Sequence, residues 1–254
     1  MNLHFLGTGT STGIPQIGCN CEVCKSTDSK DKRLRASAIL SHNGTNLLID
    51  CGPDFRTQML ENNSPHLDAM VITHSHYDHV GGVDDLRPYC KTSDFPIYCK
   101  SDVIKDLQNR VPYCFAKHPY PGVPSFQLFE ISVGNTFKIN NIEIEPLSIF
   151  HYKLNILGFK FGNLAYITDA KTIPDESIDK ILNIDTLVIN SLRIDEHISH
   201  MSLKETLDII QRVNPRIAYL THLSHDMGKH EDVEKNLPPN VKIAYDNLTL
   251  TVNE

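Results

Sequence analysis

The stretch Val71–Gly82, "VITHSHYDHVGG", places three histidines and an aspartate directly after an apolar run. His74 and His76 are two positions apart, so in extended backbone both side chains point to the same side. Asp78 and His79 follow, where a pair of glycines indicates a turn. This density of metal-binding side chains at one predicted strand end favours a metal site over a solvated polar loop.

Three more candidate ligands also follow apolar runs. His151 comes after "EIEPLSIF", Asp169 after "LAYIT" and His222 after "RIAYLT". Each position alone is typical of a turn or cap residue. Strand ends that meet at one edge of a sheet are a common place for a site in α/β proteins, so the shared position predicts that these side chains converge.

The donors are numerous enough for two metal ions. The predicted division gives His74, His76 and His151 to one ion, Asp78, His79 and His222 to the other, and Asp169 to both as a bridge. Imidazole and carboxylate donors suit zinc, manganese and iron alike, so donor chemistry does not choose among these ions.

A second metal-binding pattern lies near the N-terminus. The stretch Gly18–Cys24, "GCNCEVC", holds three of the chain's seven cysteines. Three thiolates are one donor short of a closed tetrahedral zinc site. The alternative is three free thiols in a loop. The other cysteines are scattered, and we interpret them as buried or incidental.

Composition and charge limit the classes of protein that fit this chain. The chain has 254 residues, of which 40% are hydrophobic, and this suffices for one sizeable core. A net charge of -7 disfavours broad electrostatic binding to nucleic acid. No apolar run is long enough to span a membrane, and the first residues lack a secretory pattern. Clustered cysteines are typical of metal binding in a reducing compartment, so we expect a cytoplasmic protein without a membrane partner.

Apolar runs of strand length alternate with helical patterns along the chain. The expected helices cover residues 53–62, 101–111, 202–213 and 230–237. Ser101 and Ser202 are the predicted caps, and Glu205 completes a capping box with Ser202. The chain ends in a β-α-β-α-β pattern, and the Pro- and Gly-rich segment 111–124 predicts a surface loop at the rim of the site. We therefore expect one α/β domain, residues 1–254, built around a sheet sandwich.

These patterns together resemble the metallo-β-lactamase superfamily. The resemblance is carried by "THSHYDH" with the downstream His151, Asp169 and His222, and it extends from "FLGTGTSTGIP" to "THLSHD". It implies a four-layer αββα sandwich. The stretch "LLIDCG" matches as well, and it implies that Asp50 orients a metal-binding histidine.

Further motifs resemble the PhnP branch of phosphodiesterases, namely "LGTGTSTGIPQIGCNCEVC", "HVGGVDDLR" and "HISHMS". This resemblance implies a structural zinc ion held by Cys19, Cys21, Cys24 and His225. It also implies that a small, cyclic phosphodiester is hydrolysed by water that two divalent ions activate. Manganese or zinc are the first choices for these ions, and iron or nickel are further choices. A homodimer is the implied assembly.

The expected catalytic residues are His200, as the acid that protonates the leaving oxygen, and Asp78. A solvated loop is the alternative interpretation of His200, and His197 is a second candidate for its role. Arg87 is predicted either to pair with the substrate phosphate or to form an ion pair with Asp84 or Asp85.

Three other functions compete with this interpretation. A tRNA 3′-processing nuclease of the same superfamily would usually carry a basic Gly- and Lys-rich arm, which the sequence lacks. A thioester or lactam hydrolase would use the same metal donors but would leave the cysteine loop unexplained. A non-catalytic metal-binding protein would have little need of the complete donor set.

Overall fold

The computed structural model describes residues 1–118 and 120–253, and two seven-stranded sheets form its centre. The first sheet has the order β14-β1-β2-β3-β4-β5-β6, with β1 (Asn2–Gly7), β2 (Ser37–His42), β3 (Thr45–Ile49), β4 (Ala69–Val71), β5 (Phe95–Cys99), β6 (Phe126–Glu130) and β14 (Thr249–Thr251). The second has the order β13-β12-β11-β10-β9-β8-β7, with β7 (Phe137–Ile139), β8 (Ile142–His151), β9 (Leu154–Phe161), β10 (Leu164–Ile167), β11 (Thr186–Asn190), β12 (Ile217–Thr221) and β13 (Val241–Ile243).

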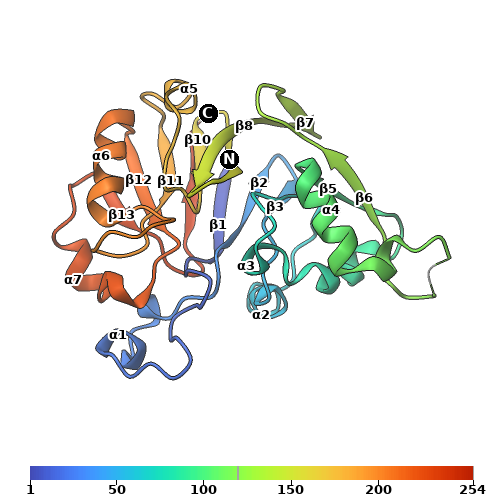
Figure 1. Cartoon of the computed structure of the whole chain (residues 1–254), viewed down its shortest axis with the longest axis horizontal. Helices are drawn as coiled ribbons and strands as arrows, with labels where there is room; N and C mark the ends of the chain where they lie inside the picture. Colours follow the sequence, from blue (N-terminus) through green and yellow to red (C-terminus); the bar gives the residue numbers. More distant parts are fainter. Residues whose placement is uncertain (119, 254) are drawn as a thin grey trace.

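Helices cover the two outer faces, with α6 and α7 on one side of the molecule and α2 and α4 on the other (Figure 1). The α-helices are α1 (Glu22–Lys25), α2 (Phe55–Glu61), α3 (Tyr77–Val80), α4 (Ser101–Arg110), α5 (Asp175–Asp179), α6 (Leu203–Val213) and α7 (His230–Glu234). Short 3₁₀ helices are η1 (Ser29–Asp31), η2 (Val83–Cys90), η3 (Pro112–Phe115) and η4 (His225–Met227).

Alternating side chains on the strands build the layers. On β3, Leu47 and Ile49 pack between the two sheets, whereas Leu48 packs outward against the helical layer. On β9, Phe159 lies between the sheets and Ile156 faces the other helical layer. Apolar residues on both faces of a strand require cover on both faces, so the sequence pattern itself demands helices outside each sheet. The predicted four-layer α/β sandwich is confirmed.

Most predicted elements form. Each apolar run predicted as a strand is one, and the three-residue β7 is the strand that the patterns missed. Ser202 caps α6 and Glu205 completes the predicted capping box. The prediction that Ser101 caps α4 is wrong, because Ser101 is already helical and Lys100 is the cap residue. The predicted loop 111–124 contains η3, and its Pro119, like the chain's last residue, Glu254, lies outside the described residues.

Parallel strands set the position of the candidate site. β3, β4 and β5 run parallel in one sheet, and β10, β11 and β12 run parallel in the other. Three strand ends carry unusual backbone, since Asp50, Asp169 and His222 have φ values of 60°, 58° and 56°. Non-glycine residues rarely adopt this left-handed conformation, and where they do it often marks a functional site.

Every helix in the described part of the chain is too short or too polar to cross a membrane.

Candidate metal centre

The densest group of donor atoms lies where these strand ends meet. Asp78, His79, Asp169 and His222 are all buried, and one ligand atom from each lies within 4.8 Å of the others. His79 Nε2 is 3.2 Å from Asp169 Oδ2 and 3.3 Å from Asp78 Oδ2. His222 Nε2 is 3.2 Å from Asp169 Oδ1 and 3.6 Å from Asp78 Oδ2. Both carboxylates therefore face both imidazoles.

The remaining three predicted donors lie beside this group. The ring centroids of His74 and His76 are 4.5 Å apart, and those of His76 and His151 are 5.0 Å apart. His74 joins the two groups, because its ring centroid is 4.2 Å from that of His79. The structure thus brings all seven predicted donors together from four separate segments of the chain.

Unpaired nitrogen atoms indicate what this cluster can hold. The Nε2 atoms of His74 and His79, and both ring nitrogens of His222, are buried and form no hydrogen bond among the described residues, although the Nε2 atoms of His79 and His222 lie close to carboxylate oxygens. A buried polar atom without a partner costs about 1–3 kcal/mol, so such a concentration calls for a ligand. Converging imidazole and carboxylate donors fit divalent metal ions, which would use these lone pairs.

A hydrogen-bond chain from Asp50 orients two of the imidazoles. His79 Nδ1 donates to Asp50 Oδ2 at 2.7 Å, as the sequence resemblance implied for one histidine. Thr73 donates to the same carboxylate through its amide and its hydroxyl, each at 2.8 Å, and His74 Nδ1 lies 3.0 Å from the Thr73 hydroxyl oxygen. Because the Nδ1 atoms of His79 and His74 each have a hydrogen-bond partner, the Nε2 atoms of these two histidines face the cluster.

The backbone around Asp169 is held by an amide side chain that sequence reasoning missed. Asn190, at the end of β11 and fully buried, accepts from the Ala170 amide at 2.7 Å and donates to the Ala170 carbonyl at 3.0 Å. Met201 N also donates to this carbonyl at 2.9 Å. Ala170 therefore links the strained Asp169 to the segment that carries His200. No signal in the sequence distinguishes Asn190 from any other strand-end asparagine.

A second support, also missed, comes from α4. Ser75, between His74 and His76, donates its hydroxyl to Asp106, and Arg110 Nη2 donates to the Ser75 carbonyl at 3.0 Å. Both helix residues act on the turn that separates the two histidines. This explains why α4 packs beside the predicted metal-binding stretch.

Electrostatics keep the carboxylates ionised. Burial alone would raise the pKa of Asp169, but His222 and His79 hold it well below its usual range. Burial lowers the pKa of His74, and that of His76 as well. His79 differs, because burial lowers its pKa but Asp169 and the neighbouring carboxylates raise it above the ordinary value. Metal binding would therefore displace a proton from His79.

His200 lies inside the cluster and not in a solvated loop. Its Nε2 is 3.1 Å from Asp169 Oδ1, and its ring stacks on that of His222 with centroids 5.1 Å apart. Burial lowers the pKa of His200 to about 4, although Asp169 acts in the opposite direction. One ligand atom each from His151, Asp169 and His200 also lie within 4.8 Å of one another. The sequence predicted that His200 acts as an acid, and its position in the structure also makes it a potential metal donor.

Beyond His200, a polar path leads outward. His200 Nδ1 is 3.0 Å from the Ser199 hydroxyl and 3.3 Å from His197 Nδ1. The Ser199 carbonyl accepts from His151 Nδ1 at 2.8 Å. The alternative candidate His197 therefore lies behind His200 rather than in its place.

The cysteine cluster is a separate group of donors. One ligand atom each from Cys19, Cys21, Cys24 and His225 lie within 4.8 Å of one another, and His225 Nδ1 is 3.4 Å from Cys21 Sγ. A hydrogen bond from the Cys24 amide is the main cause that lowers the pKa of Cys21 to about 6. Three sulfurs and one nitrogen form a closed donor set of the kind that structural zinc occupies.

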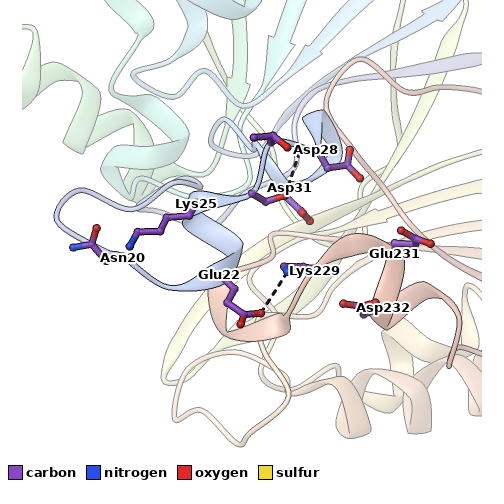
Figure 2. Close-up of a pocket in the computed structure, with 10 residues that line it drawn as sticks. Asn20, Glu22, Lys25, Asp28, Asp31, Lys229, Glu231 and Asp232 are labelled. Atoms are coloured by element: carbon purple, nitrogen blue, oxygen red, sulfur yellow. Dashed lines mark hydrogen bonds and ion pairs between the residues drawn. The ribbon is translucent and has the colours of Figure 1, made fainter.

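A polar cavity of about 680 Å³ is lined by residues that neighbour these cysteines in the chain, among them Asn20, Glu22 and Lys25 (Figure 2). It separates α1 and η1 from α7, and Lys229 Nζ crosses part of it to reach Glu22 Oε2 at 3.3 Å. Its walls carry charges of both signs, and it lies apart from the His and Asp donors. We assign no chemistry to it.

Arg87 forms the predicted ion pair with Asp84, and its contact with a substrate phosphate stays a prediction. Its Nη2 lies 2.9 Å from Asp84 Oδ2 and 3.0 Å from Asp84 Oδ1, and its Nη1 donates to the Gly122 carbonyl. Both members of the pair are exposed. Among the scattered cysteines, Cys51, Cys99 and Cys114 are buried, as interpreted.

Comparison with known proteins identifies a family, a sequence relative and two similar structures. The Beta-lactamase superfamily domain model matches residues 45–223. An octanoyltransferase of Porphyromonas gingivalis is 41% identical over all of this chain, which spans 52% of that relative's length. A structure described as a new diphosphatase from the PhnP family is 33% identical, with a TM-score of 0.92 and coverage of 99% of this chain and 98% of that one. Zn²⁺-bound PqqB from Methylobacterium extorquens shares the fold, at 18% identity and a TM-score of 0.82 over 99% of this chain and 100% of that one.

Proposed function

The chain belongs to the metallo-β-lactamase superfamily, close to its PhnP branch, and from this premise we propose that it is a metal-dependent phosphodiesterase acting on small substrates. The superfamily fold is that of metal-dependent hydrolases. The observation that carries the proposal is the convergence of seven imidazole and carboxylate donors, several of them unpaired, beside His200.

We assign the donors to two divalent ions, in the division that the sequence predicts. His74, His76 and His151 would hold one, Asp78, His79 and His222 the other, and Asp169 would contact both. When bound, such ions supply an activated water molecule and offset the negative charge of a phosphodiester. The chain's own contribution is a fixed donor geometry, because Asp50 and Asn190 lock the side chain of His79 and the backbone after Asp169.

His200 is the group that we assign to proton transfer toward the leaving oxygen. Its Nε2 is held by Asp169, and its Nδ1 faces Ser199 and His197, which lead outward from the cluster. This arrangement can resupply a proton after each turnover. The cluster contains no residue arranged as a serine or cysteine nucleophile among those described, so attack by water fits the site best.

Two observations support our choice of substrate class. The PhnP-family relative is a diphosphatase by its description, which favours cleavage of a bond between phosphorus and oxygen. A net charge of -7 disfavours a polyanionic nucleic acid. Small, and in particular cyclic, phosphodiesters are therefore our first choice. The octanoyltransferase relative makes a medium-chain thioester the second candidate, although this chain spans about half of that protein.

A substrate panel tests the proposal. The protein is loaded with Mn²⁺, Zn²⁺ or Ni²⁺ and assayed on cyclic and linear phosphodiesters, diphosphates, precursor tRNA, an octanoyl thioester and a lactam. We expect the highest kcat/KM for a small phosphodiester. Hydrolysis of the thioester or lactam without any phosphodiesterase activity would reject the proposal, and so would a preference for precursor tRNA. Activity on none of these substrates by metal-loaded protein would favour a non-catalytic role.

The cysteine cluster completes the proposed metal content, with one structural zinc ion on Cys19, Cys21, Cys24 and His225. The homodimer suggested by the PhnP resemblance stays a prediction, which sedimentation velocity of the metal-loaded protein would test.

A further inference from the structure

A cavity of about 500 Å³ is lined by the segment before β2, the last residue of α2 and the segment between β13 and β14. Its volume lies in the range of small-molecule sites. Among the described residues that line it there is neither a predicted metal donor nor His200, so it is separate from the metal centre. The charged and aromatic side chains of its lining are Lys30, Lys32, Arg33, Glu61, Asp246 and Tyr245.

Arg33 is a buried cation, only 4% exposed, that forms no ion pair within the described part of the chain. Its Nη1 donates to the Thr8 hydroxyl at 2.7 Å and to the Ala244 carbonyl at 2.5 Å, and its Nη2 lies 3.2 Å from His230 Nδ1. Burial and Arg33 itself lower the pKa of His230, so this ring is neutral near pH 7. A buried charge is costly unless an opposite charge pairs with it, and all three partners of Arg33 are uncharged.

Asp246 is the carboxylate that acts most strongly on Arg33, yet it binds other donors. Its Oδ1 accepts from the Thr8 hydroxyl at 2.7 Å, and its Oδ2 accepts from the Leu34 amide at 2.6 Å. Burial raises the pKa of Asp246 to about 6, whereas a guanidinium in direct contact would hold that pKa below its usual range. Asp246 therefore offsets only part of the charge of Arg33.

Two further cations line the same cavity. Lys30 Nζ lies 4.7 Å from the centre of the Tyr245 ring, and Lys32 Nζ donates to the Cys24 carbonyl at 3.1 Å. Neither amine forms an ion pair with any residue that the structure describes. Lys30 is partly exposed and has a long, flexible side chain, so its amine can turn from the ring to a bound anion. The lining thus offers a fixed cation, Arg33, and a movable one, Lys30.

We propose that this cavity binds a small organic anion whose carboxylate or phosphate head contacts Arg33 and Lys30. The head would place a negative charge in direct contact with the buried guanidinium, where hydrogen bonds are of the strong, charge-assisted kind. The body of the ligand would pack against Tyr245, Ile14 and Leu34, which also line the cavity. A bare inorganic anion would leave most of this volume to water, since one water molecule occupies about 30 Å³. This binding does not depend on the proposed phosphodiesterase function.

Calorimetric titration of the metal-loaded protein with benzoate, phenylphosphonate and the uncharged benzamide tests the proposal. At least one of the two anions should bind about tenfold more tightly than benzamide, because the amide cannot form the charged contacts. Lys30→Gln should weaken binding of that anion by about tenfold and leave benzamide unchanged. Lys204→Gln, on the exposed face of α6, is the matched control. Since replacement of the buried Arg33 can unfold the chain, the test relies on Lys30.

Chemical modification locates the bound anion. Acetylation of surface amines, followed by peptide mass spectrometry, should proceed several-fold more slowly at Lys30 when the anion is present, and at an unchanged rate at Lys204. This readout also separates the cavity from the metal centre, where both anions could bind a metal ion. A larger effect of benzoate identifies a carboxylate head, and a larger effect of phenylphosphonate identifies a phosphate head.

Three results would overturn the assignment of this cavity. They are affinities for both anions no higher than that for benzamide, anion binding that Lys30→Gln leaves unchanged, and acetylation of Lys30 at the same rate with and without the anions.

Discussion

Asp169 is the residue on which the candidate site depends most. It contacts His79, His222 and His200 through its two carboxylate oxygens. It does so from left-handed backbone, with φ at 58°. Strain of this kind persists only when surrounding contacts enforce it, and here Asn190 provides them on the adjacent residue, Ala170.

Asp169→Asn should lose most of its active-site metal. The amide removes the charge that faces three imidazoles, and its nitrogen cannot act as a ligand. We expect kcat/KM to fall by at least about 100-fold, because substitution of residues outside the ligand shell already costs about 10- to 100-fold. Elemental analysis and steady-state kinetics measure both effects. Asp208→Asn, on the exposed face of α6, is the control. Full metal content in the Asp169 variant would contradict the bridging role.

Asn190→Leu tests the support behind Asp169. It removes two buried hydrogen bonds to Ala170, each worth about 1 kcal/mol. We expect about 2 kcal/mol lower stability of the metal-free protein in urea and about tenfold weaker binding of active-site metal. Lower stability with unchanged metal affinity would show that Asn190 acts on the fold alone.

At the scale of elements, the turn that carries Asp78 and His79 depends on two points where separate backbone segments are in direct contact. A Cβ added at Gly52 would lie 2.1 Å from the Asp78 carbonyl oxygen, and one at Gly82 would lie 2.1 Å from the Gly52 carbonyl oxygen. The segment after β3 and the α3 turn therefore pack backbone to backbone. These two glycines are the reason that Asp78 and His79 can reach the cluster from so short a helix.

Gly52→Ala should displace α3. Because the obstacle is a carbonyl oxygen, relief requires movement of the backbone that carries Asp78. We expect lower metal content together with a lower urea midpoint. Gly134→Ala is the comparison, since Gly134 has open space around it and a φ of 88°, so only a conformational penalty of about 1 kcal/mol applies. A Gly52 variant no worse than the Gly134 variant would argue against the steric explanation.

At the start of α6, the charge of Glu205 makes the stability of the protein depend on pH. Burial would raise the pKa of Glu205, but donors from Lys171 and Ser202 lower it below the ordinary value. A depressed pKa in the folded state means that Glu205 stabilises the protein above the unfolded-state pKa. That contribution is lost as pH falls through the folded-state pKa.

Glu205→Gln isolates this charge, because glutamine can keep the capping box. With Glu205 about one third exposed, we expect the variant to be less stable than wild type by about 0.5 kcal/mol at pH 7. The difference should shrink as pH falls below the ordinary glutamate pKa of about 4.3, and vanish once pH lies below the lowered pKa of the folded state. Urea unfolding at several pH values measures it, with Glu196→Gln as an exposed control. A difference that persists in acid would assign the effect to packing.

At the scale of the whole molecule, the N-terminal segment ties the two candidate metal groups together. Thr10 N donates to the Leu223 carbonyl at 2.9 Å, and Leu223 N donates to the Thr8 carbonyl at 3.0 Å. Leu223 directly follows His222 and lies two positions before His225. One short loop therefore contacts the cluster of His and Asp donors, the cysteine cluster and the segment that follows β1.

Cys21→Ser should release one tightly held zinc ion and also weaken active-site metal binding. The reason is that the cysteine cluster anchors the loop that carries His222. We expect the affinity for active-site metal to fall by about tenfold, as for other changes outside a ligand shell. Metal analysis after mild chelation and metal titration measure the two effects, and Cys90→Ser is the control. Retention of the tight zinc would reject the Cys₃His assignment, and unchanged active-site affinity would reject the coupling.

The sequence alone predicted every described strand except β7, the capping box of α6 and the seven candidate donors that the structure brings together. These depend on local order, because alternation, cap geometry and the position of a residue after a strand are properties of neighbours in the chain. Tertiary structure decided the contacts that span long separations. It placed His200 against Asp169, Asn190 against Ala170 and Arg87 against Gly122. Such pairs form only when the two sheets and their helices pack, since no local pattern specifies which distant side chain will meet a given buried polar group.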